Sequence, residues 1–219
     1  LLRIRTSFQG ERSEVSQHLL KDMREGIHWL WTHPLIRSLA FLSGYLYTIM
    51  AGSVLIILVI ARQHSIPSTT TAIIFAIGGV GNIVGTALCT PFQRRIRFGW
   101  ALGSMLILFV LIWPFYGLTS NPIVLAGIVA ALAIIDSISS ILIASYRLAA
   151  VPNELQGRVG SIYRLILYST LALGQALIGP CLEHFGVFAT VAILWGGLLL
   201  FTAIMLVNPH VRLALHPLE

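Results

Sequence analysis

The chain has 219 residues, of which 57% are hydrophobic and only 10% are charged. A soluble domain carries about 25% charged residues, so this composition excludes an ordinary water-soluble fold. The net charge of +6 does not by itself indicate a nucleic-acid partner, because the positions of the charges decide what they bind.

The segment before the long apolar runs is polar and mixed. Apolar residues recur every four positions from Val15 to Ile27, which predicts an amphipathic helix over 11–33. Trp29 and Trp31 suit the membrane interface, and a plain linker helix is compatible with the same pattern. The chain begins with a leucine and shows no signal-peptide pattern, so we expect it to be a piece of a longer protein.

Six apolar runs follow, and each is long enough to cross a bilayer, which takes about 20 residues. The third run should be kinked at Pro114. Because the connections are short, consecutive helices should be antiparallel neighbours. The six predicted spans are 38–61, 71–90, 99–118, 122–149, 162–182 and 187–207.

The basic residues predict the orientation of the bundle. Of the 14 lysines and arginines, all except Arg62 precede the first span or lie around the connections after the second, fourth and sixth. Positive residues gather on the cytoplasmic side, so both termini are expected there. Topology and lipid headgroups then explain the charge without nucleic acid. The predicted organisation is a cytoplasmic linker over 1–36, a six-helix transmembrane bundle over 37–207 and a cytoplasmic tail over 208–219.

Sequence signatures of enzymes and metal sites are missing from the chain. It contains no His-Glu-x-x-His, Gly-x-Ser-x-Gly, Cys-x-x-Cys or Walker lysine loop. Its seven histidines do not pair at metal-ligand spacing on one helix face. We therefore expect neither an enzyme nor a metal or cofactor site.

Asp136 is the only acidic residue inside the six predicted spans, and it lies near the middle of the fourth. An acid at that depth costs about 2.5–3.5 kcal/mol on insertion scales, so it should face the bundle interior or a wet cavity. Desolvation there favours the uncharged acid and would help it take up a proton. A structural acid, hydrogen-bonded to a neighbouring helix, is the alternative. Ser139 and Ser140 continue a polar stripe towards Arg147.

Further polar side chains within the spans are candidates for a cavity lining, or else for contacts between helices. Asn82 can bond either to a neighbour or to a substrate. On the same helix, Gly81 and Gly85 form a small-xxx-small pair that permits close helix approach. The cavity-lining candidates are Tyr45, Thr48, Asn82, Ser140, Tyr168 and Gln175.

Three stretches carry a family resemblance. They are EGIHWLWTHPLIR at 25–37, VPNELQGRV at 151–159, and GQALIGP at 174–180 followed by Phe185-Gly186. They resemble the entry to helix seven, the inner loop between helices ten and eleven, and helix eleven with its exit in the major facilitator superfamily. The likeness covers about residues 20–207 and is to the branch with enterobactin exporters and macrolide efflux pumps.

The resemblance implies the C-terminal half of a twelve-helix transporter in the inner (plasma) membrane of a bacterial-type cell, with substrate bound between two six-helix halves that rock against each other. It implies proton-coupled efflux of a small amphipathic molecule, such as a siderophore, a macrolide or another drug. Asp136 would be the proton-coupling or substrate-contact residue of this half, and the N-terminal six-helix half would be its partner.

The resemblance also implies a cytoplasmic gating surface formed by Arg94, Arg95, Gly157 and Arg158, in which the glycine permits a tight turn. The family usually has an Asp-Arg pair after its eighth helix, and this chain has no acid there, with Thr90 or Gln93 near that place. The alternative function is a six-span structural or sensory protein acting as a homodimer. Six further spans encoded upstream would decide for the transporter.

Overall fold

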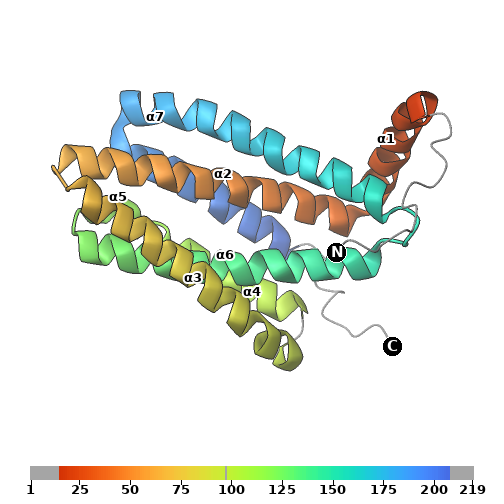
Figure 1. Cartoon of the computed structure of the whole chain (residues 1–219), viewed down its shortest axis with the longest axis horizontal. Helices are drawn as coiled ribbons and strands as arrows, with labels where there is room; N and C mark the ends of the chain where they lie inside the picture. Colours follow the sequence, from red (N-terminus) through yellow and green to blue (C-terminus); the bar gives the residue numbers. More distant parts are fainter. Residues whose placement is uncertain (1–14, 97, 208–219) are drawn as a thin grey trace, which may run out of the picture.

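A computed structural model describes residues 15–96 and 98–207, and within these ranges the chain is all-helical (Figure 1). Five helical segments are long and apolar enough to cross a membrane. The helices are α1 (Val15–Thr32), α2 (Pro34–Gln63), α3 (Ser68–Arg95), α4 (Phe98–Ile112), α5 (Phe115–Leu118), α6 (Pro122–Ala150) and α7 (Gln156–Val207). The predicted linker before residue 15 and the predicted tail after residue 207 lie outside the described residues.

The 52-residue helix α7 contains two of the predicted spans. Gly186 interrupts it with a φ of 77° and a ψ of 177°, and there the chain reverses, so that its two limbs run in opposite directions (Figure 1). Only glycine adopts this backbone conformation at little cost. With each limb of α7 counted separately, the described residues contain the six long apolar segments predicted from hydropathy, although the last two are joined by one residue.

The helices extend beyond the predicted spans. Helix α2 begins at Pro34 rather than near residue 38, since proline suits the first turn of a helix, where its missing N–H is not needed. Helix α6 begins the same way at Pro122, and the side chain of Asn121 caps it by accepting a hydrogen bond from the backbone N–H of Ile123 at 2.9 Å. Helix α3 continues through Pro91 to Arg95.

The third pass breaks where Pro114 predicts a kink, and α4 and α5 lie on either side of it. Trp113 at this break is fully buried, and its indole N–H donates to the carbonyl oxygen of Val191 at 3.3 Å. In return, the indole of Trp195 donates to the carbonyl oxygen of Val110 at 2.8 Å. This reciprocal pair of hydrogen bonds ties the third pass to the second limb of α7.

The expectation that consecutive helices are neighbours is wrong for the main contacts, which join α3 to α6 and α2 to α7. Small residues set the closest of these contacts. In α3, a Cβ added at Gly81 or Gly85 would lie 2.7 Å from a backbone carbonyl oxygen of α6. Next to these glycines, the hydroxyl of Ser137 donates to the Asn82 side chain at 2.8 Å. Apolar burial does little to drive association between helices in lipid, so close backbone approach and interhelical hydrogen bonds hold such pairs together.

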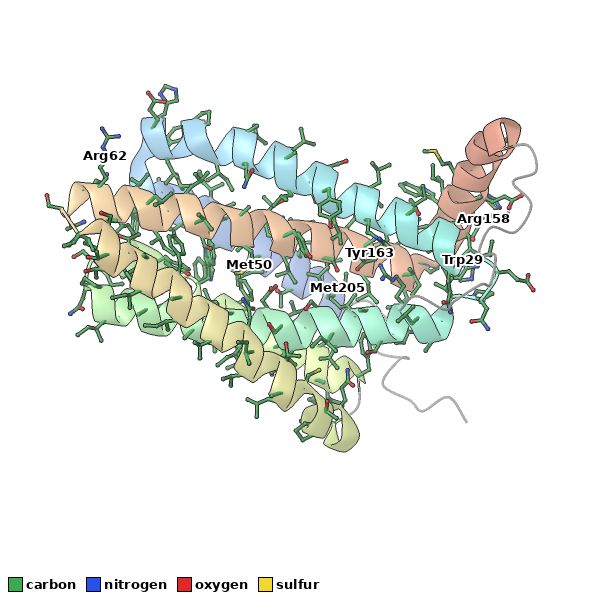
Figure 2. All side chains as sticks on the ribbon, viewed as in Figure 1. Trp29, Met50, Arg62, Arg158, Tyr163 and Met205 are labelled. Carbon is green, nitrogen blue, oxygen red and sulfur yellow. The ribbon has the colours of Figure 1, made fainter. Side chains whose placement is uncertain are left out.

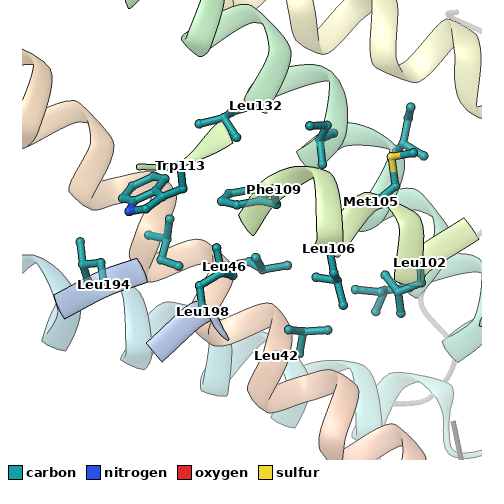
Figure 3. Close-up of a cluster of buried hydrophobic side chains, with 14 of the residues drawn as sticks. Leu42, Leu46, Leu102, Met105, Leu106, Phe109, Trp113, Leu132, Leu194 and Leu198 are labelled. Carbon is teal, nitrogen blue, oxygen red and sulfur yellow. The ribbon is translucent and has the colours of Figure 1, made fainter. Parts of the chain in front are cut away.

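The contact between α2 and α7 uses the same chemistry. The hydroxyl of Thr48 donates to the carbonyl oxygen of Thr170 at 2.8 Å, and a Cβ at Gly174 would lie 2.2 Å from the Thr48 methyl group. Between these two helix pairs lies an apolar core to which α2, α4, α6 and the second limb of α7 contribute (Figure 3). Its side chains include Leu42, Leu46, Leu102, Met105, Leu106, Phe109, Trp113, Leu132, Leu194 and Leu198.

The two ends of the bundle differ in charge. Arg158 lies at the end that carries α1, and Arg62 lies at the opposite end (Figure 2). Arg147 in the last turn of α6 also belongs to the Arg158 end, because α7 begins six residues after α6. The described basic side chains are therefore distributed as the sequence predicts.

Candidate functional site

A cavity of about 500 Å³ opens between α2, α6 and the first limb of α7. This volume lies within the usual range of small-molecule sites. Each of the three helices contributes both polar and apolar side chains to its wall. The lining consists of Ser43, Leu46, Tyr47, Asp136, Ser140, Ile141, Ile143, Ala144, Arg147, Tyr163, Arg164, Leu167 and Tyr168.

Asp136 is the middle residue of α6, and its partly buried side chain lines this cavity. Ser140, Ala144 and Arg147 follow at spacings of four, four and three residues and line the same wall. Side chains at such spacings share one face of a helix. The polar stripe predicted from Asp136 towards Arg147 is therefore a single cavity-facing surface of α6.

Tyr163 of α7 lines the cavity and contacts both α2 and α6. Its hydroxyl donates to the carbonyl oxygen of Leu39 at 3.2 Å, so the hydroxyl of Ser43, 2.5 Å away, is the donor in their mutual hydrogen bond. The guanidinium carbon of Arg147 lies 4.3 Å from the centre of the tyrosine ring, within the range of a cation–π interaction. Tyr163 is 3% exposed, so Arg147 rests on a ring that is fixed on its other side by α2.

The six cavity-lining candidates occupy three kinds of position. Ser140 and Tyr168 line this cavity together with Asp136. Tyr45 and Thr48 instead make helix contacts: the Tyr45 hydroxyl donates to the carbonyl oxygen of Leu194 at 2.7 Å, and that of Thr48 donates to Thr170.

The remaining two candidates lie away from this cavity. The side chain of Asn82 accepts the Ser137 hydroxyl at the contact between α3 and α6, although the residue as a whole is exposed. Gln175 is exposed on the first limb of α7. Neither residue is part of the wall described above.

Sequence reasoning did not name Ser43, Tyr163 and Arg164 as cavity-lining residues, and it left Tyr47 and Arg147 out of the six candidates. A signal for Arg164 was available, because it precedes the candidate Tyr168 by four residues and so shares its face of α7. No comparable signal identified Tyr47, which is 39% exposed, in preference to Tyr45 two residues earlier.

The predicted gating surface is described in part. Arg158 at the start of α7 forms an ion pair with Glu25 of α1. Next to this pair, a Cβ at Gly26 would lie 3.1 Å from the carbonyl oxygen of Arg158, so α1 approaches the α7 backbone closely. Gly157 borders a smaller cavity of about 260 Å³ that also reaches Arg147. The side chains of Arg94 and Arg95 lie outside the described part of the chain.

These features define a multi-pass helical membrane protein whose spans enclose a partly polar cavity. Among the described residues, no group of three or more histidines, cysteines or acids is placed to bind a metal ion. Searches against protein-family models, curated proteins and solved structures give no match to this chain.

Proposed function

We propose that this chain is half of a secondary active transporter, resembling the C-terminal six-helix half of a major facilitator protein. It exports a small amphipathic molecule by alternating access, with proton movement through Asp136 as the energy source. Both termini face the cytoplasm in this proposal, and the second half of the transport path comes from an N-terminal six-helix bundle.

One observation carries the proposal: an acid at the midpoint of a membrane-length helix faces a cavity of small-molecule size. Ionisable residues at this depth are costly, and they usually mark ion or substrate pathways. Within the described residues, Asp136 makes no hydrogen bond or ion pair that would explain it as a helix-packing contact. Its wall of the cavity continues through Ser140 to Arg147.

Exposed polar residues at membrane depth support a second half on the cavity side. Tyr168 is 59% exposed and Tyr47 is 39% exposed, and both lie beside the cavity opening. Polar side chains at this depth normally face protein or a water-filled cavity rather than lipid. A second six-helix bundle placed against this face would cover the tyrosines and close the cavity.

The contact between α1 and α7 fits a cytoplasmic gate. Glu25 and Arg158 are both partly exposed, so their ion pair is weak enough to open and close during a transport cycle. The ion pair joins α1 to the first turn of α7, next to the connection between α6 and α7. Movement of this connection would thereby be transmitted to α1.

The test is proton-driven flux by the full-length gene product in liposomes, read out with a fluorescent amphipathic dye under an imposed pH gradient. Asp136→Asn keeps the shape and hydrogen-bonding capacity of the side chain but removes its titration. An amide cannot take up and release the coupled proton. Because a positioned side chain that transfers a proton accelerates a reaction by about 10²-fold or more, we expect at least a tenfold loss of proton-driven flux. The amount of folded protein should be unchanged.

Glu183→Gln is the matched control, because it also neutralises an acid but lies beside Gly186, away from the cavity. It should leave flux unchanged. Near-normal, pH-dependent flux in the Asp136→Asn variant would overturn the proton-carrier role and favour a structural acid. Robust flux by the 219-residue chain alone would favour a homodimer over two unlike halves.

A further inference from the structure

Two arginines, Arg147 from α6 and Arg164 from α7, line the cavity from different helices. Both also border the smaller cavity next to it, so their side chains lie between the two spaces. Within the described residues, Glu25 pairs with Arg158, and no carboxylate pairs with Arg147 or Arg164. Each guanidinium therefore keeps N–H donors that suit a carboxylate, sulfonate or phosphate group.

Arg147 is held in place before any ligand arrives. Its guanidinium carbon lies over the ring of Tyr163, 4.3 Å from the ring centre, and the tyrosine is fixed by Ser43 and the Leu39 carbonyl. Within the described residues the guanidinium makes no hydrogen bond, so its N–H groups are available to a ligand. A donor that is already ordered loses less entropy when it binds a ligand.

The charges along the cavity are unequal. Asp136 is the only acid in the lining, against two arginines. It lies 11 residues before Arg147 on α6, which corresponds to about 16 Å of helical rise. At that separation Asp136 does not pair with Arg147, so the arginine end of the cavity stays positive even when the aspartate is ionised.

The wall between the charged ends is apolar and aromatic. Leu46 of α2, Ile141 of α6 and Leu167 of α7 line the cavity together with Tyr47 and Tyr168. We propose that this cavity binds an amphipathic organic anion, whose acidic group lies between Arg147 and Arg164 and whose apolar body packs on the tyrosine side. This inference rests on the proposed function, since it names the class of molecule that the transport cavity accepts.

The test compares three probes of one shape: 2-naphthoate, the neutral 2-naphthalenemethanol and the cationic 2-naphthylmethylammonium. Binding to the full-length protein is measured by calorimetry in nanodiscs of zwitterionic phosphatidylcholine. We expect naphthoate to bind at least tenfold more tightly than the other two probes. Arg147→Gln and Arg164→Gln should each weaken naphthoate binding by about tenfold, because each removes charge-assisted hydrogen bonds, and should leave binding of the alcohol unchanged.

Arg62→Gln, at the opposite end of the bundle, is the matched control and should not alter naphthoate binding. Should the cavity variants fail to fold, salt provides a second measurement on the unmodified protein. Naphthoate binding should weaken as ionic strength rises, and binding of the alcohol should not. Equal affinity for all three probes, or salt-independent naphthoate binding, would overturn the inference.

An anionic lipid headgroup has the same chemistry as a soluble organic anion, so the measurement is repeated with phosphatidylglycerol in the nanodiscs. Competitive loss of naphthoate binding would assign the arginines to a lipid headgroup, and unchanged binding would assign them to a soluble anion. Either result supports an anion site. Anion-selective binding without proton-driven flux would refute the transporter proposal alone, whereas flux without anion preference would refute this inference alone.

Discussion

Gly197→Ala tests the helix packing that shapes the bundle. A Cβ at Gly197 on the second limb of α7 would lie 2.1 Å from the Tyr45 hydroxyl oxygen and 2.7 Å from its ring carbon Cζ. The tyrosine must move, and then it loses the hydrogen bond to the Leu194 carbonyl and the stacking on Phe201 at a centroid distance of 4.8 Å. An interhelical hydrogen bond in a membrane contributes about 0.6 kcal/mol and an aromatic pair about 0.5–1.5 kcal/mol. With some lost packing, we expect a destabilisation of about 2 kcal/mol.

The neighbouring residue provides the control. A Cβ at Gly196 meets nothing within 4 Å, so Gly196→Ala should leave stability unchanged or raise it by up to about 1 kcal/mol. Stability is measured from reversible unfolding in mixed micelles, followed by circular dichroism. Tyr45→Leu removes the atoms that clash, so in that background Gly197→Ala should cost little.

Equal effects of Gly196→Ala and Gly197→Ala would refute this account of the contact between α2 and α7. So would a full cost of Gly197→Ala in the Tyr45→Leu background, since the double-mutant cycle would then show no coupling between the two residues.

Two further predictions concern the contact between α3 and α6 and the orientation of the chain. Gly85→Ala should destabilise the protein by about 2 kcal/mol in the same unfolding assay. Its Cβ would lie 2.7 Å from the Ile134 carbonyl oxygen, and backbone cannot move aside as a side chain can. Gly79→Ala is the control, because its Cβ would meet nothing within 4 Å, and an equal loss of stability in both variants would contradict the reasoning. In a variant without native cysteines, a membrane-impermeant maleimide added to whole cells should label Ser65→Cys but not Glu154→Cys, and the opposite pattern would invert the proposed topology.

Hydropathy was sufficient to predict the six passes, because each needs only a long enough apolar run. The break at Pro114 also followed from local chemistry, since proline cannot continue the hydrogen-bonding pattern of a helix. The reversal at Gly186 was predicted only as a boundary between two helices. Its form depends on one glycine in a left-handed conformation, and glycine residues are too common in the spans for composition alone to single it out.

The residues of the cavity were harder to predict than the passes, because they depend on how each helix is rotated about its axis. Tyr45 and Tyr47 are two residues apart and therefore point about 200° apart around α2. The sequence gives both the same chemistry, yet only Tyr47 lines the cavity. The rotation of α2 is set by distant partners, namely Leu194 for Tyr45 and Thr170 for Thr48. Asp136 was easier to select, because its charge at mid-span is informative in any rotation.

The connections at the Arg62 end of the bundle leave almost no free chain. They are residues 64–67, residues 119–121 and, between the limbs of α7, Gly186 alone. Segments this short cannot fold over a cavity as a lid, and they offer few places for a protease or an antibody to engage. Any opening at this end must therefore come from tilting whole helices. The two limbs of α7 would have to tilt together, because Gly186 alone joins them.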